Sequence, residues 1–279
     1  MDRHHPSGRG ESAVSRTGTR LDPILASVQA RAAARRAVQP VADLRAEVQP
    51  DPARRARFIE ALRAPGMQVI AECKRRSPAK GMLRDEADLS QRARTYADGG
   101  AAALSILTEE DHFKGSLAEL ANVAGAGLPR LRKDFVLDEG MVLESLSAGA
   151  DAILLLAVCL PDPLLGELRA LAGELGLAVL LEVHAPDELE RALAVDPDCL
   201  GVNARDLTTF EIDLAHIEEM LPQVPDRFVR VAESGIRDQA DVARVARVGA
   251  DAVLVGETLM LAEDPAAKIR SFREVEVQR

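Results

Sequence analysis

A short motif that returns at fixed distances restricts the fold of this chain more than any other feature of its sequence. The segment GADAILL at 149–155 returns as GADAVLV at 249–255, and a weaker copy, GGAAAL, occupies 99–104. Each copy has the pattern of a glycine that ends a helix, a tight turn and a short buried strand. The starting positions 99, 149 and 249 are spaced by multiples of fifty residues, which indicates regularly repeated strand and helix units.

Eight short apolar runs follow this rhythm, and stretches with helical spacing of apolar residues separate them. Alternating strands and helices predict a parallel sheet, and eight βα units predict a closed (βα)8 barrel, the TIM barrel of the α/β class. A doubly wound open sheet, the alternative, usually has fewer units and a Gly-x-Gly-x-x-Gly turn, which this sequence lacks. The runs lie at 68–73, 102–107, 130–132, 152–156, 177–183, 199–202, 228–232 and 252–255.

Composition divides the chain into three parts. Residues 1–20 are rich in Gly, Ser, Thr, Arg and His and predict a disordered tail. Residues 21–64 have apolar residues at helical spacing and predict a helical extension, which begins at the capping pair Asp22-Pro23. Residues 65–279 then form the barrel, in one domain with the extension. With no Trp, one Tyr and six Phe, the core must be aliphatic, which suits buried parallel strands.

The charge and the cysteines exclude several classes of protein. A formal net charge of -10 argues against nucleic acid as a partner, so the charges that bind any anionic ligand must be local. Cys73, Cys159 and Cys199 form no Cys-x-x-Cys pair, which favours buried reduced thiols over disulfides or a zinc site. No apolar run is long enough to span a membrane, and no secretory signal precedes the extension. We therefore expect a cytoplasmic protein without a membrane partner or a bound metal.

Polar residues stand at the end of nearly every predicted strand. In a (βα)8 barrel the active site lies at the carboxyl ends of the strands, so these side chains should converge on one rim. Glu72 and Lys74 are two residues apart and point the same way on a strand, and mixed charges in one cleft suit acid–base chemistry. Solvated loop charges or a stabilising ring of ion pairs are the alternatives. The strand-end set is Glu72, Lys74, Thr108, Glu109, Lys133, Asp134, Glu182, His184, Asn203, Arg205, Glu233 and Glu257.

The last two strands end in sequences that predict a phosphate site. The loops after strands seven and eight commonly bind phosphate in this fold, and here they begin Ser234-Gly235 and Gly256-Glu257. Glycine allows backbone N–H groups to approach an anion closely. Because a carboxylate is unfavourable beside a phosphate, we expect the Glu257 side chain to point away from it.

The strand-end residues lie within longer motifs that resemble those of indole-3-glycerol-phosphate synthases. The first-strand segment VIAECKRRSPAKG at 69–81 is the most specific of them. The resemblance covers about residues 21–270, with every strand represented in order. The further motifs are LTE at 107–109, FKGS at 113–116, RKDF at 132–135, LEVH at 181–184, GVN at 201–203, RDL at 205–207 and ESGI at 233–236.

The resemblance implies a reaction of tryptophan biosynthesis without a metal or organic cofactor. The substrate would be 1-(2-carboxyphenylamino)-1-deoxyribulose 5-phosphate, and the products indole-3-glycerol phosphate, carbon dioxide and water. Lys133 resembles the general acid of the family, and Glu182 resembles its second acid–base group. Glu72 resembles a supporting carboxylate, and Lys74 the substrate-binding lysine of the same network. The protein would then be a carboxy-lyase.

The same resemblance assigns the binding residues. Arg205, oriented by Asn203, would hold the anthranilate carboxylate through a forked pair of hydrogen bonds, and the extension would lie over the barrel mouth with its positive charge near the ligand. Ala79 and Ala204 depart from residues common in the family, but neither removes a named side chain. Phosphate and substrate contacts are assigned to Ser77, Ser234, Gly235, Gly256 and Glu257, and apolar walls around the aromatic ring to Phe113 and Phe135, unless these are ordinary core residues.

Two other functions remain open at this point. A related barrel enzyme such as phosphoribosylanthranilate isomerase would lack the pair Glu72 and Lys74 and the helical extension. A non-catalytic barrel that only binds a phosphorylated ligand would have lost a strand-end residue of the catalytic set, and none is lost. We expect a monomer or a weak homo-oligomer.

Overall fold

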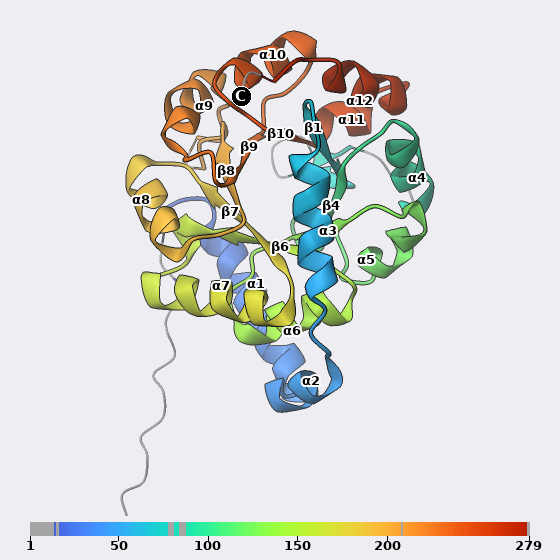
Figure 1. The fold of residues 1–279 in the computed structure, drawn as a ribbon. Coiled ribbons are helices and arrows are strands. Elements are labelled where there is room, and N and C mark those ends of the chain that lie inside the picture. Colours follow the sequence, from blue (N-terminus) through green and yellow to red (C-terminus); the bar gives the residue numbers. More distant parts are fainter. Residues whose placement is uncertain (1–13, 15–16, 78–80, 84–87, 208, 278–279) are drawn as a thin grey trace, which may run out of the picture.

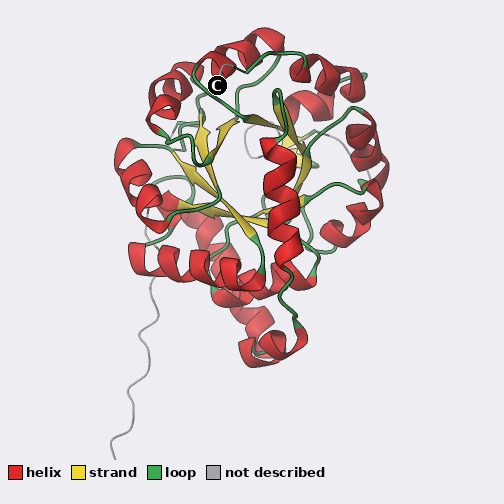
Figure 2. Cartoon of the chain, viewed as in Figure 1, coloured by secondary structure: helices red, strands yellow, loops and turns green. Residues whose placement is uncertain are grey.

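The computed structural model describes residues 14, 17–77, 81–83, 88–207 and 209–277, and their centre is a closed barrel of parallel strands (Figures 1 and 2). Each strand pairs with its neighbours in chain order, and the first pairs with the last through Gln68 and Ala252. The predicted (βα)8 barrel is therefore confirmed. Its strands are β1 (Gln68–Cys73), β4 (Ala103–Leu107), β5 (Arg130–Lys133), β6 (Ala152–Leu156), β7 (Ala178–Val183), β8 (Cys199–Asn203), β9 (Val229–Glu233) and β10 (Ala252–Val255).

Helices surround the barrel on its outside (Figure 2). Every residue of β1, β6 and β7 is buried, because one face of each strand packs inside the barrel and the other packs under helices. The aliphatic core predicted from composition is thus divided between the barrel interior and the layer beneath the helices. The surrounding helices are α4 (Ser90–Asp98), α5 (Glu119–Asn122), α6 (Glu139–Ser147), α7 (Asp162–Leu175), α8 (Pro186–Val195), α9 (Leu214–Met220), α10 (Gln239–Arg247), α11 (Glu257–Leu261) and α12 (Pro265–Arg273).

The repeated Gly-Ala-Asp motif has the same structural role in both of its full copies. Oδ2 of Asp151 accepts a hydrogen bond of 2.8 Å from the backbone N–H of Arg130, and Oδ2 of Asp251 accepts one of 2.9 Å from that of Arg230. Gly149 adopts a φ of 88° and ends the turn after α6. Each aspartate therefore ties the start of its own strand to the start of the preceding strand.

Three helices precede the barrel: α1 (Asp22–Val38), α2 (Val41–Glu47) and α3 (Pro52–Arg63). The resemblance implied that this extension lies over the barrel mouth, and for α3 this expectation is wrong. Figure 1 shows α3 crossing the amino-terminal opening of the barrel, where Phe58 and Leu62 are fully buried. The reason is an apolar stripe that fills this opening, flanked by arginines that bind aspartates at the strand starts.

Arg54, Arg55 and Arg57 of α3 form ion pairs with aspartates at that opening. Arg57 donates to both carboxylate oxygens of Asp151 at 2.7 Å, and Nε of Arg55 donates to Asp198 at 2.7 Å. The positive charge of α3 therefore stabilises the closed end of the barrel and does not face a ligand at the mouth.

Helix α1 does reach the mouth. Leu21 and Ile24, at its start, line the cavity described below, and Arg31 forms ion pairs with Glu110 and Asp111 in the loop after β4. Most of the predicted tail lies outside the described residues. The backbone N–H groups of the described residues Thr17 and Gly18 donate to Asp22.

The predicted burial of Cys73, Cys159 and Cys199 is confirmed, and none of the three forms a disulfide. Among the described helices, none combines the length and the apolar character needed to cross a membrane.

Candidate active site

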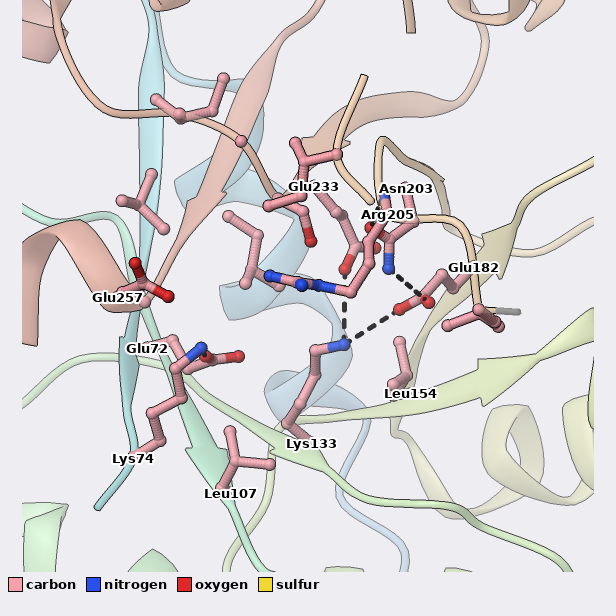
Figure 3. A pocket seen from close by; sticks show the side chains of 18 of the residues that line it. Glu72, Lys74, Leu107, Lys133, Leu154, Glu182, Asn203, Arg205, Glu233 and Glu257 are labelled. Carbon is pink, nitrogen blue, oxygen red and sulfur yellow. Dashed lines mark hydrogen bonds and ion pairs between the residues drawn. The ribbon is translucent and has the colours of Figure 1, made fainter. Parts of the chain in front are cut away.

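A cavity of about 680 Å³ opens at the carboxyl ends of the strands. Figure 3 shows side chains from different strands pointing into it, with Lys133 near its centre. Apolar and charged residues both contribute to the wall, and they come from α1, from the strand ends and from the loops that follow them. The predicted convergence of the strand ends on one rim is therefore observed. Of the predicted site residues, Glu72, Lys74, Phe113, Lys133, Phe135, Glu182, Asn203, Arg205, Ser234, Gly235, Gly256 and Glu257 line the cavity.

Lys133, the last residue of β5, lies between two acidic side chains. Its Nζ lies 2.9 Å from Oε2 of Glu182 and 3.5 Å from Oε2 of Glu233. Burial alone would lower the pKa of Lys133, but the surrounding carboxylates, Glu182 foremost, outweigh it and raise the pKa above its ordinary value. At neutral pH Lys133 is thus an ammonium group inside a cavity lined by both charged and apolar side chains.

A buried network fixes the end of β5 next to this lysine. Oδ2 of Asp134 accepts hydrogen bonds from Oγ1 of Thr108 at 2.6 Å and from Nη2 of Arg132 at 2.9 Å. All three side chains are buried. Because Lys133 stands between Arg132 and Asp134 in the strand, its backbone is held from both sides.

Glu182, on β7, is held as an anion. Nδ2 of Asn203 donates to its Oε1 at 2.8 Å, and Nε2 of His184 lies 3.1 Å from the same oxygen. Burial would raise the pKa of Glu182, but Lys133 and then His184 outweigh it and hold the pKa well below its ordinary value. The group is therefore a carboxylate able to accept a proton.

Glu233, at the end of β9, favours the neutral, protonated form, whereas Glu182 is ionised. Burial and then the neighbouring charge of Glu182 raise the pKa of Glu233 to about 8. Its Oε1 packs on β8, where a β-carbon added to Gly201 would lie 2.1 Å away. Two carboxyl groups beside one lysine thus have pKa values moved in opposite directions, which is an arrangement suited to acid–base catalysis.

Lys74 and Glu72 form a second pair across the cavity from Glu182 (Figure 3). Nζ of Lys74 lies 2.6 Å from Oε1 of Glu72, and the lysine side chain is 16% exposed. The alternation of a strand, which places residues two apart on one side, explains why both reach the cavity.

Arg205 is oriented by the loop that carries it. Its backbone N–H donates to Oδ1 of Asn203 at 3.0 Å, and its Nη1 donates to the carbonyl oxygen of Phe210 at 3.1 Å. The predicted link between Asn203 and Arg205 is therefore present. The guanidinium lines the cavity and carries several N–H donors that suit an acidic group there.

Comparison with known proteins identifies the family. The family model for indole-3-glycerol phosphate synthase matches residues 21–272. An indole-3-glycerol phosphate synthase of a Nocardioides species is 47% identical over 258 residues, which cover 92% of this chain and 98% of that protein. That of Mycobacteroides abscessus is 43% identical, over 91% of this chain and 93% of its own.

The chain belongs to the indole-3-glycerol phosphate synthase family. The resemblance read from the sequence is thus confirmed, and so is the prediction of an enzyme of this class, a carboxy-lyase.

Solved structures with low sequence identity share the fold of this synthase. Thiamine phosphate pyrophosphorylase from Pyrococcus furiosus has a TM-score of 0.57 at 18% identity and covers 78% of this chain and 96% of its own. The 3-hexulose-6-phosphate synthase from Salmonella typhimurium has a TM-score of 0.58 at 18% identity, over 75% of this chain and 97% of its own. These likenesses support the barrel fold alone.

The predicted phosphate edge of the synthase adjoins the cavity. Ser234 and Gly235 have φ values of 65° and 77°, so the backbone turns sharply after β9 and lines the cavity there. Gly256 and Glu257 line it from the turn before α11, and Figure 3 shows the Glu257 carboxyl on the same side as Lys74. Ser77 pairs through its backbone with Gly81 in a small ribbon of β2 (Arg76–Ser77) and β3 (Gly81–Met82), and its side chain lies outside the described part.

The sequence motifs do not indicate roles for Glu233 and His184. Both were recognised as strand-end residues, and that position was the only signal available. Their importance depends on their distances from Lys133 and Glu182, which the fold sets and the sequence does not state.

Proposed function

We propose that this chain converts 1-(2-carboxyphenylamino)-1-deoxyribulose 5-phosphate into indole-3-glycerol phosphate, carbon dioxide and water. The observation that carries the proposal is the position of Lys133, an ammonium 2.9 Å from Glu182 and 3.5 Å from Glu233 inside the cavity. The reaction needs a proton donor, a proton acceptor and a shielded space for an aromatic ring, and these three residues with the apolar wall supply them.

Lys133 acts in the ring closure. The ring carbon that bears the carboxylate attacks the ketone carbon, a carbon–carbon bond forms, and the ketone oxygen takes a proton from Nζ of Lys133. An alkoxide is more basic than an amine, so the transfer is downhill even from a lysine with a raised pKa. The ammonium charge also stabilises the oxygen while its negative charge develops. Loss of carbon dioxide then returns the bonding electrons to the ring.

Glu182 and Glu233 act in the dehydration. The carboxylate of Glu182 removes a proton from the carbon next to the ring nitrogen, and the hydroxyl leaves as water with a proton from the neutral carboxyl of Glu233. Glu182 then returns its proton to Lys133, which lies within hydrogen-bond distance, and Glu233 takes one from solvent. The cycle consumes one proton overall, as decarboxylation of a carboxylate requires.

The other predicted residues bind the substrate. Arg205 holds the ring carboxylate in a forked pair, because a guanidinium matches that group in shape and charge. Lys74, kept in place by Glu72, contacts the sugar phosphate part from the opposite side of the cavity. Phe113 and Phe135 are proposed as the walls around the aromatic ring, and Ser77, Ser234, Gly235, Gly256 and Glu257 as the contacts to the phosphate and adjoining atoms.

Further proposals concern the setting of the enzyme. Buried cysteines without disulfides at positions 73, 159 and 199 suit a reducing compartment, so we propose that the protein works in the cytoplasm. The acid–base residues Lys133, Glu182 and Glu233 line one cavity within a single barrel, so we propose a monomer or a weak homo-oligomer.

The test is the fluorescence of the indole product after addition of the substrate to the purified protein. The chain has no Trp, so its own signal is low. We expect the wild type to produce the signal and Lys133→Ala to lose it. Lys268→Ala, on α12 outside the cavity lining, should match the wild type. A folded wild type without signal would reject the proposed function, while a signal in Lys133→Ala would transfer the acid role to another residue, with Lys74 the nearest candidate.

A further inference from the structure

Three charged side chains, Glu182, His184 and Glu188, form a row from the active site into α8. Glu182 of β7 faces Lys133 with Oε2 and faces His184 with Oε1, at 2.9 Å and 3.1 Å. On its other side, Nδ1 of His184 lies 3.5 Å from Oε2 of Glu188. An imidazole thus separates two carboxylates, of which only the first borders the cavity.

We propose that His184 is a positioning residue for Glu182, which it holds as an oriented carboxylate together with Asn203. The inference rests on the proposed function of Glu182 and assigns no substrate contact to His184. It extends the active site by one layer, toward α8.

The geometry fixes Glu182 from three directions. Nζ of Lys133 donates to Oε2 at 2.9 Å and Nδ2 of Asn203 donates to Oε1 at 2.8 Å, while Nε2 of His184 lies 3.1 Å from Oε1 as an ion-pair contact without hydrogen-bond geometry. Without His184, Oε1 would keep one partner, and the carboxylate could turn about its terminal bond away from Lys133. Groups that orient metal-ligating side chains typically change activity by about 10- to 100-fold when removed, and we expect an effect of the same order for a group that orients Glu182.

Glu188 in turn holds the imidazole. Its Oε2 accepts a hydrogen bond of 2.7 Å from the backbone N–H of His184, which fixes the carboxylate at the start of α8. Glu188 is only 8% exposed, so its charge is weakly screened by solvent. The His184 ring is therefore placed by a buried anion on one side and fills the space behind Glu182 on the other.

The charges around His184 favour the imidazolium form. Burial alone would lower the pKa of His184, but Glu182 and Glu188 outweigh it and raise the pKa to about 9. The titratable group on the neighbouring turn is Cys159, whose pKa is raised by burial and by the same two carboxylates, so it stays a neutral thiol. From the barrel side Lys133 and Glu233 act on the row through Glu182. A cationic His184 keeps Glu182 ionised.

Steady-state kinetics of variants test the proposal. We expect His184→Ala to lower kcat by about 10- to 100-fold with KM within about two-fold of wild type. His184→Gln, whose amide can donate to Glu182, should recover a large part of the loss. The kcat of Glu188→Gln should lie between those of His184→Ala and the wild type, because the glutamine keeps an acceptor for the backbone N–H but removes the charge. His216→Ala on α9 is the control for removal of an imidazole and should match the wild type.

A change in KM alone, or a kcat of His184→Ala within two-fold of wild type, would overturn the proposal. If His184→Ala does not fold, His184→Gln and Glu188→Gln decide the question by the same criterion.

A readout without catalysis separates this inference from the proposed function. The chain has five histidines, so the imidazole nitrogen signals of the resting protein can be assigned by NMR. We expect His184 to be doubly protonated at pH 7 in the wild type and to titrate at lower pH in Glu182→Gln. Titration of His184 at its ordinary value in the wild type would overturn the positioning role even in an active enzyme. An inactive wild type with the expected titration would reject the reaction but leave the His184–Glu182 contact established.

Discussion

A β-carbon built on Gly256 would lie 2.2 Å from Oε1 of Glu72, so a side chain at position 256 would occupy the place of the Glu72 carboxylate. The same β-carbon would lie 2.8 Å from Nζ of Lys74. Gly256→Ala must therefore displace the pair of Lys74 and Glu72 from its present position. We expect kcat/KM to fall by about ten-fold or more, since displacements of about 1 Å in an active site have effects of this order.

The matched control is Gly166→Ala in α7, where a β-carbon would meet nothing within 4 Å. That variant should keep full activity and gain about 0.5 to 1 kcal/mol of stability, because alanine is favoured over glycine within a helix. Equal activity of Gly256→Ala and Gly166→Ala would show that the pair tolerates displacement.

Glu233 makes the stability of the enzyme depend on pH. Its pKa in the folded protein is about 8, against an ordinary value of 4.5. Between these values the unfolded chain releases a proton that the folded protein keeps, so the free energy of unfolding falls as the pH rises through this window and levels off above 8. Glu233→Gln removes this dependence.

We therefore expect Glu233→Gln to gain stability relative to the wild type as the pH rises from 5 to 9. Each 1 kcal/mol of gain corresponds to about 2 to 4 °C in Tm for a domain of this size. Thermal melts of both proteins across the pH range measure the difference, and indole formation by the variant should fall. A Tm difference that is constant over this range would contradict the raised pKa.

Arg205 should discriminate between ligands with and without the ring carboxylate. The guanidinium is held by Phe210 through one N–H, and a forked contact to a carboxylate needs the planar group that lysine lacks. We expect Arg205→Lys to weaken binding of a reduced, non-cyclising substrate analogue by about ten-fold. Binding of the same analogue without its ring carboxylate should be unchanged, which calorimetry can measure. Equal weakening for both analogues would place the carboxylate elsewhere.

Much of the fold and of the active site could be predicted because both depend on local patterns. Buried strands appear as short apolar runs, and the barrel places whatever follows them on one rim. Lys133 and Glu182 were found in this way, and their separation of 2.9 Å is a consequence of the barrel. The pairing of Lys74 with Glu72 could also be expected from their spacing of two residues on one strand.

The parts that were missed depend on packing between distant segments. The position of α3 follows from Phe58 and Leu62, which fit the amino-terminal opening, and no pattern in residues 52–63 indicates which end of the barrel they close. In the same way the pKa of Glu233 follows from burial beside Glu182. Strand-end position showed that Glu233 was close to the site but could not show its protonation state.

The aspartate of the repeated motif should matter for stability and not for catalysis. The carboxylate of Asp151 is fully buried at the closed end of the barrel, where it accepts from the backbone N–H of Arg130 and from Nη2 of Arg57. Asp151→Ala leaves the N–H of Arg130 without its acceptor, which typically costs about 1 to 3 kcal/mol, while Arg57, whose side chain is 46% exposed, stays hydrated when it loses this partner. We expect a Tm lower by several degrees and an unchanged kcat per folded molecule, because the active site lies at the opposite end of the barrel. Asp226→Ala, in an exposed loop, controls for loss of a carboxylate; a Tm of Asp151→Ala equal to that of this control would mean that the repeated aspartate does not hold the strands together.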